Sequence, residues 1–218
     1  MEIYKLGGDQ SSNITLEITD MRQAVKNKNR VNVFVNQKYS FSLDVAQLVD
    51  LKLKVGAKIS EAELAEYKKL SEFGKLYQRT LEWVLARPRS EKEAFDYLYK
   101  KIYEKKLDKN YINSIIERLK NKKYLDDERF AKYYVENRFV KKGVSRRRLE
   151  MELMKKGIKK EIIEKVLSDS VRSDEEEILK IIAKKRARYD DEKLTQYLCR
   201  QGFSYELVQN LVRTYGKD

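Results

Sequence analysis

Clusters of lysine and arginine are the residues in this sequence whose type and spacing best fit a chemical task. The densest runs are Lys141-Lys142, Arg146-Arg147-Arg148 and Lys184-Lys185-Arg186. Cationic side chains gathered in this way bind phosphate groups or acidic protein surfaces. The arginine run directly follows Ser145, a residue type that often begins a helix, so the first backbone amides of that helix can also face an anion. Because cations oppose the helix dipole at this end, the run indicates a use beyond helix stability.

We predict one basic contact surface for a polyanion or for a partner protein. Its members are Arg138, Lys141, Lys142, Arg146, Arg147, Arg148, Lys155, Lys156, Lys184, Lys185, Arg186 and Arg188. A single run of charge is usually only a solvated helix face. Recurrence at matching places of a repeat favours binding, because repeated positions line up along one surface. The formal net charge of +13 agrees with an anionic partner.

Catalysis has little support in the residues. The chain has no histidine and one cysteine, Cys199, which excludes histidine-based catalysis, an internal disulfide and nearly every type of zinc site. The glycine-rich phosphate loop that ends in Lys-Ser or Lys-Thr does not occur. Asp190-Asp191-Glu192-Lys193 resembles a nuclease-like group of carboxylates, but Asp190 has a simpler role as a helix cap. We therefore expect no enzyme activity, no metal and no cofactor.

The sequence contains no apolar run near the length of a membrane span, and its start lacks the apolar core of a signal peptide. We expect a monomer in the reducing cytoplasm, without a membrane partner.

The elements that must position these cations form a threefold repeat. Ser90, Ser145 and Asp190 each begin a helix that carries a leucine eight residues later, and the leucines are Leu98, Leu153 and Leu198. In the second and third copies a glycine follows four residues after the leucine, at Gly157 and Gly202, where a helix must end. The first copy has four extra residues before Leu107, which matches Ile158 and Phe203. Apolar residues then follow at identical offsets in all three copies.

Those offsets place the apolar residues on one stripe of a helix. Each copy is therefore predicted to contain three short helices that bury little alone and share a core when stacked. We expect a mainly α fold of three tandem three-helix repeats that form an elongated array. The expected divisions are residues 61–123, which include a long first helix, residues 124–172 and residues 173–218.

Residues 1–60 are predicted to form a small β-rich domain. Ile14, Leu16 and Ile18 alternate with polar residues as on a half-buried strand, and Val31–Val35 and Tyr39–Leu43 do the same on either side of a short polar turn. Asp44 can cap a short helix that runs through Leu51. A capping box at Ser60–Glu63 then begins a helix that we expect to reach about Ala86, before Pro88.

One segment resembles a known family. It begins Tyr124-Leu125-Asp126-Asp127-Glu128-Arg129-Phe130-Ala131 and continues with Tyr134-Val135, Arg138, Lys142-Gly143, Arg147-Arg148-Leu149, Glu152-Leu153 and Lys156-Gly157-Ile158. This pattern is similar to the RecX family, the regulators of bacterial RecA recombinase. The middle repeat matches closely and the flanking repeats match by pattern. One departure is Gly143-Val144-Ser145-Arg146, where many members carry Gly-x-Gly-Pro.

The resemblance implies a modulator, usually an inhibitor, that binds the RecA filament on single-stranded DNA and restrains ATP hydrolysis and strand exchange. Two alternatives stay open: a DNA- or RNA-binding repeat module independent of RecA, and a protein-interaction scaffold. The signature residues themselves are mostly structural in our interpretation. We expect Asp126 or Asp127 to be an N-cap, Phe130, Tyr134 and Leu153 to be core, and Arg138 to complement a helix dipole.

Overall fold

The structure is a computed structural model that describes residues 16–141, 143–170 and 172–215, with the side chains of residues 139–141 left undescribed. The chain divides into two compact units, residues 1–79 and residues 80–218.

The first unit contains a four-stranded antiparallel sheet. The strands are β1 (Leu16–Gln23), β2 (Arg30–Val35), β3 (Lys38–Asp44) and β4 (Lys58–Ile59), in the order β3-β2-β1-β4. The predicted hairpin is confirmed as β2 and β3. Its turn has two residues, Asn36 and Gln37, both with positive φ (48° and 65°), as the right-handed twist of the strands favours. The short pairing of β1 with β4 was not predicted. Ile14 lies outside the described residues.

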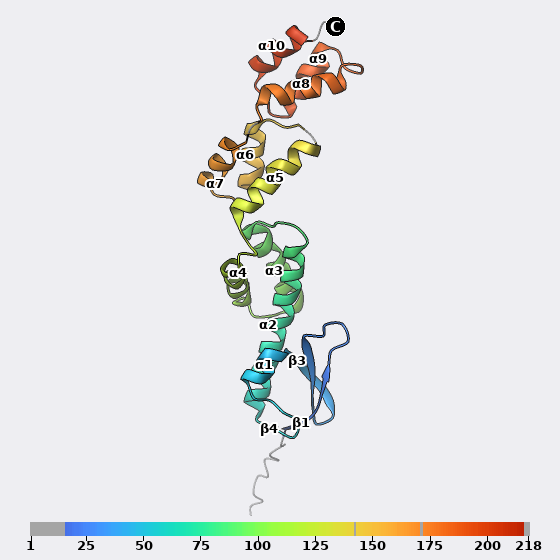
Figure 1. Cartoon of the computed structure of the whole chain (residues 1–218), viewed down its shortest axis with the longest axis vertical. Helices are drawn as coiled ribbons and strands as arrows, with labels where there is room; N and C mark the ends of the chain where they lie inside the picture. The colour runs from blue at the N-terminus through green and yellow to red at the C-terminus, as the bar shows by residue number, and fades with distance from the viewer. Residues whose placement is uncertain (1–15, 142, 171, 216–218) are drawn as a thin grey trace, which may run out of the picture. The chain divides into compact units, whose positions relative to one another are not determined.

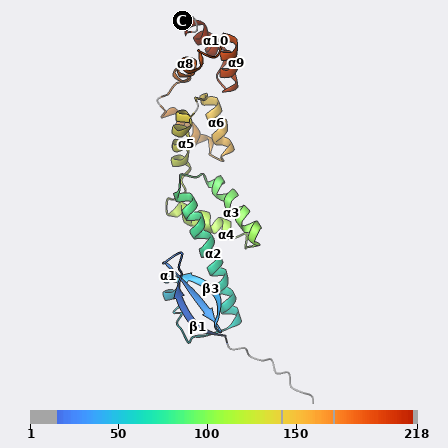
Figure 2. The same ribbon diagram turned by 90° about the vertical axis from the view of Figure 1, so that its right-hand side faces the viewer.

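A helix covers one face of this sheet, as Figure 2 shows for α2 (Glu61–Leu85). Tyr67 of α2 packs against Phe41, with ring centroids 5.5 Å apart, inside a cluster that also holds Ile18, Val33 and Leu43. The short helix α1 (Val45–Asp50) follows β3 and is capped by Asp44, as expected.

A buried arginine sits between β3 and α2. The Arg30 guanidinium donates to the Ser42 backbone oxygen, and its Nη1 atom lies 2.9 Å from the position that a Cβ on Gly74 would take. Any side chain at Gly74 would therefore displace Arg30, which explains a glycine in the middle of a long helix.

The rest of the described chain is helical, as Figure 1 shows. After α2 come α3 (Glu91–Lys105), α4 (Tyr111–Asn121), α5 (Asp127–Lys141), α6 (Arg146–Lys155), α7 (Lys160–Ser168), α8 (Asp174–Lys185), α9 (Asp191–Arg200) and α10 (Tyr205–Tyr215). With α2 counted first, this order confirms three successive sets of three helices after a small sheet in the sequence. The exact divisions at 60/61, 123/124 and 172/173 stay a prediction.

The caps that define the repeat are present. The side chains of Ser90, Ser145 and Asp190 accept the backbone N–H three residues on, at 3.1, 3.2 and 2.8 Å. Gly157 and Gly202 have left-handed φ values of 81° and 95°. In the first copy Lys106 takes the same conformation (φ 53°), so a residue with a side chain occupies the glycine position there.

Each later repeat has its own hydrophobic core. In the second, Phe130, Leu149, Leu153 and Ile163 are almost fully buried. In the third, Ile178, Leu194, Leu198 and Val208 are completely buried. Ile163 and Val208 belong to the stripe predicted from the offsets, and Leu153 and Leu198 are the repeat leucines. Tyr134 is only partly buried, and its hydroxyl donates a hydrogen bond to Glu152.

Candidate anion-binding surface

The outer face of α6 carries exposed cations and methionines. Arg147 and Lys155 are exposed, and Met151 and Met154 between them keep 47% and 45% of their area accessible. Met151, Met154 and Lys155 follow Arg147 by four, seven and eight residues, so all four lie on one side of the helix. We call them the outer face of α6. No described carboxylate pairs with either cation, and an anion or an acidic surface can therefore reach both.

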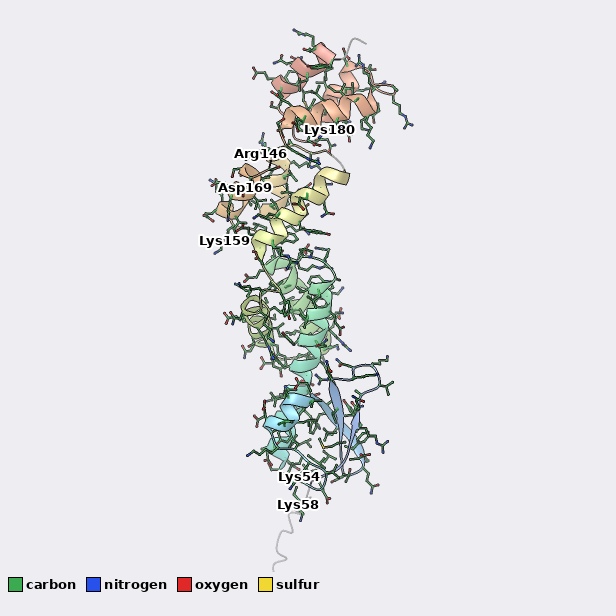
Figure 3. The ribbon with its side chains drawn as sticks, in the orientation of Figure 1. Lys54, Lys58, Arg146, Lys159, Asp169 and Lys180 are labelled. Carbon is green, nitrogen blue, oxygen red and sulfur yellow. The ribbon has the colours of Figure 1, made fainter. Side chains whose placement is uncertain are left out.

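The first turn of α6 is already occupied by groups of the protein itself. The Arg146 amide donates to Asp174 Oδ1 at 2.8 Å, and the Arg148 amide donates to Ser145 Oγ at 3.2 Å. The expectation that the amides of this turn face an external anion is therefore wrong for these two. Figure 3 shows Arg146 at the start of α6. Burial raises the pKa of Asp174, and the bond from the Arg146 amide opposes that rise.

Two predicted contact residues instead hold the second repeat together. Arg138 binds Glu152 through two bonds, Nε to Oε2 at 2.9 Å and Nη2 to Oε1 at 2.8 Å. Arg148 Nε adds a third at 3.3 Å, while its Nη1 donates to the Arg200 carbonyl at 2.8 Å. The Tyr134 hydroxyl donates to Glu152 Oε2 at 2.8 Å. The sequence suggested that Arg138 complements a helix dipole. In the structure it pairs instead with a carboxylate on α6.

This network shifts the pKa of both its acidic members. Hydrogen bonds from Arg138 are the main cause that lowers the pKa of Glu152 to about 2, against an opposing effect of burial. Burial and the bond to Glu152 raise the pKa of Tyr134 to about 12. At neutral pH the carboxylate is therefore charged and the phenol is neutral, which is the state that the bonds require.

The other predicted cations also divide into those that contact groups of the protein and those that stay exposed. Lys156 Nζ binds Glu93 Oε1 at 2.7 Å, Arg186 pairs with Asp191, and the Lys185 ammonium lies over the rings of Tyr189 and Tyr197, at 4.9 and 4.5 Å from the centroids. Lys184 and Arg188 are exposed. The Lys142 residue and the Lys141 side chain lie outside what the structure describes.

A contact between successive repeats was missed in the sequence. Asp127 Oδ1 accepts the Glu91 amide at 2.8 Å, and Asp174 Oδ1 accepts the Arg146 amide at the same distance. Each aspartate is the first residue of one repeat's first helix, and each amide begins the second helix of the preceding repeat. The signal was available, because both aspartates directly follow a cap residue. Asp126 is the cap before Asp127, accepting the Arg129 amide at 3.0 Å.

The described residues contain no group of acidic, cysteine or histidine side chains that could hold a metal ion. No helix in the described ranges is long and apolar enough to cross a membrane. What the arrangement offers chemically is the binding of anions by exposed cations on helices.

The fold and these contacts define a class: a helical-repeat protein with a small sheet domain. Residues 16–60 match the family model described as the RecX N-terminal domain, and residues 126–167 match the RecX second three-helix domain. The chain belongs to the RecX family of regulatory proteins.

Two relatives named "Regulatory protein RecX" illustrate the relationship. That of Bacillus pumilus is 32% identical over 204 residues, covering 90% of this chain and 76% of its own. That of Bacillus licheniformis is 33% identical over 199 residues, covering 88% and 74%. These relatives are named as regulators and not as enzymes.

Solved structures share the fold. A crystal structure of regulatory protein RecX is similar with a TM-score of 0.66 at 22% identity, covering 90% of this chain and 98% of that one. The RecX structure from Lactobacillus salivarius gives 0.54 at 25% identity, covering 65% and 95%.

Proposed function

We propose that this protein regulates RecA recombinase, most simply as an inhibitor, by binding the RecA filament on single-stranded DNA. Binding would restrain ATP hydrolysis and strand exchange, and so modulate recombination and DNA repair in the cytoplasm, without catalysis by the protein itself. The observation that carries the proposal is membership of the RecX family over nearly the whole chain. The bacterial relatives are named for regulation, and the resemblance of the middle repeat supplies RecA as the target.

The exposed cations are the proposed contact residues. They are Arg146, Arg147, Lys155, Lys184 and Arg188, which stay exposed where Arg138, Arg148 and Lys156 are tied to carboxylates. A filament repeats its surface along its length. Several weak contacts from successive repeats of one chain can therefore add through effective concentration. Each neutralised phosphate or carboxylate would also make binding weaker in high salt.

The test is RecA-dependent ATP hydrolysis on single-stranded DNA with increasing amounts of the full chain. We expect hydrolysis to slow when the protein is well below the amount of RecA. No change in hydrolysis over a wide range of protein and salt would contradict the proposal. Binding to the filament should be measured in parallel by co-sedimentation.

A pair of charge reversals tests the contact surface separately. Arg147→Glu with Lys155→Glu should raise the amount needed for half-inhibition by roughly tenfold, because two attractive contacts become repulsive. The matched control reverses two exposed lysines of the first repeat, Lys109→Glu with Lys122→Glu. If both pairs act equally, only net charge matters and the outer face of α6 is not the contact.

The second candidate is direct binding of DNA or RNA without RecA, which the net charge of +13 favours. Salt-titrated binding to a bare oligonucleotide, with and without RecA, separates the two functions. A steep salt slope with no gain from RecA supports direct binding. If RecA increases the binding affinity and the charge reversals do not remove this increase, the result supports a contact made only with protein.

A further inference from the structure

A cationic pocket lies beside the connection between α2 and α3, entirely within the second unit. Its wall includes Arg87, Glu93, Tyr133, Tyr134, Arg138 and Lys156. The residues come from three places in the chain: the start of the α3 segment, the middle of α5 and the end of α6. Only Lys156 and Arg138 belonged to the surface predicted from sequence, and there they were treated as separate surface charges.

Positive charge in and behind this pocket exceeds the negative charge. Glu93 is approached by three cations: Lys156 at 2.7 Å, Arg87 at 3.1 Å and Arg89 at 4.0 Å. The second carboxylate, Glu152, is shared by Arg138 and Arg148. Among the described residues these ion pairs join five cations to two carboxylates, which leaves three positive charges.

The pocket also keeps its cations within reach of solvent. The side chains of Arg87 and Lys156 are 36% and 38% exposed, while the Glu93 carboxylate between them is only 15% exposed. An incoming anion would therefore meet the cations before it meets the carboxylate. Tyr133 is half-buried and lines the pocket. Its hydroxyl makes no hydrogen bond to another described residue, so it can donate to the same anion.

We propose that this pocket binds a phosphate monoester, either of a free nucleotide or at the end of a nucleic-acid strand. A phosphate monoester carries about two negative charges at neutral pH, which suits the excess of positive charge better than a carboxylate does. Arg87 and Lys156 already donate to Glu93, and Arg87 also donates to the Pro88 carbonyl. The phosphate oxygens can accept from the remaining N–H groups of these two cations and from the Tyr133 hydroxyl. The rings of Tyr133 and Tyr134 stand beside these donors and offer apolar surface next to the anion.

Direct binding to the full chain, without recombinase, tests the pocket. Calorimetry should detect AMP but not adenosine, and inorganic phosphate should compete with AMP. Arg87→Gln should weaken AMP binding by roughly tenfold or more, because a charge-assisted bond is lost. Tyr133→Phe removes one hydroxyl only and should weaken it by roughly threefold. The control is Arg129→Gln, which removes the same charge from an exposed site nearby that does not line the pocket.

Further arms separate the sources of phosphate. An oligonucleotide with a terminal phosphate that binds more tightly than its unphosphorylated copy, with the same dependence on Arg87 and Tyr133, supports a strand end. Tight AMP binding without that difference supports a free nucleotide.

The proposal is overturned by absence of AMP binding, by binding that neither variant weakens, or by an acidic peptide that displaces AMP at equal concentration. If Arg87→Gln fails to fold, Tyr133→Phe decides. The inference rests on the pocket and not on the proposed function, so either can fail alone.

Discussion

At the scale of single residues, Glu152 joins three side chains of the second repeat, Arg138, Arg148 and Tyr134. We expect Glu152→Gln to lower the free energy of unfolding by roughly 2 kcal/mol at neutral pH, because it leaves two arginines and a phenol without their charged acceptor. The folded pKa of about 2 lies below the ordinary value of 4.5, so the carboxylate stabilises the fold fully above pH 4.5. That stabilisation is lost as the pH falls toward 2.

Chemical unfolding of the wild type and of Glu152→Gln at several pH values measures this effect. The difference between the two proteins should be full at neutral pH and should shrink as the pH falls below about 4.5. Glu164→Gln is the control, because Glu164 makes only an exposed pair with Lys160, at 3.5 Å with both side chains more than 60% accessible. A difference that stayed constant with pH would rule out the carboxylate as its source.

The sequence could not predict which of the cationic residues make contacts inside the protein and which stay exposed. Arg138 and Arg148 were both predicted to be contact residues, and Arg148 stands in a basic run. Their partners lie 14 and 52 residues away in the chain, at Glu152 and at the Arg200 carbonyl. Of these bonds, only that from Arg148 to Glu152, four residues on, could be read from local spacing. The others join distant residues, which a local charge pattern does not show.

At the scale of elements, the turn before α7 ties two repeats together. A Cβ on Gly157 would lie 2.7 Å from Lys92 Cβ on α3, and the backbone there has a left-handed φ of 81°. Gly157→Ala should therefore suffer both strain and a clash, and should cost roughly 2–3 kcal/mol of stability. Gly56→Ala is the matched control, because its φ is 84° and nothing lies within 4 Å of its Cβ position.

Thermal unfolding of the two variants isolates the clash. The control should lose only about 1 kcal/mol, which is the typical penalty for a side chain in this conformation. The excess loss in Gly157→Ala then measures how tightly the turn packs on α3. Equal losses would mean that the turn and α3 do not pack as the structure shows.

Elements were the scale at which the sequence was most informative. Ser90, Ser145 and Asp190 predicted three helix starts, because an N-cap bond forms within three residues and needs no distant partner. The turn at Lys106 shows the limit, since no glycine marks it, and only its offset from the other copies identifies it. The strand β4 was missed because two residues, Lys58 and Ile59, give no alternation to detect.

At the scale of the whole molecule, two of the hydrophobic cores and a single tryptophan make the units separately observable. Phe41 is 1% exposed in the core of the first unit, and Phe130 is 1% exposed in the core of the second repeat. Trp83, the only tryptophan of the chain, belongs to the second unit, where it stacks on Tyr97 at 4.5 Å and lies under the Arg89 guanidinium. Its fluorescence therefore reports on residues 80–218.

This placement of Trp83 predicts that two equal truncations affect its fluorescence midpoint differently. Phe130→Ala should lower the unfolding midpoint seen by Trp83 fluorescence, because loss of a buried phenylalanine costs roughly 3–5 kcal/mol. Phe41→Ala should leave that midpoint nearly unchanged. It should lower the unfolding midpoint of the sheet, which is measured by hydrogen exchange of the β2 and β3 amides. Both variants shifting the fluorescence midpoint equally would show that the two units unfold as one. In that case a partner bound to either unit would stabilise both.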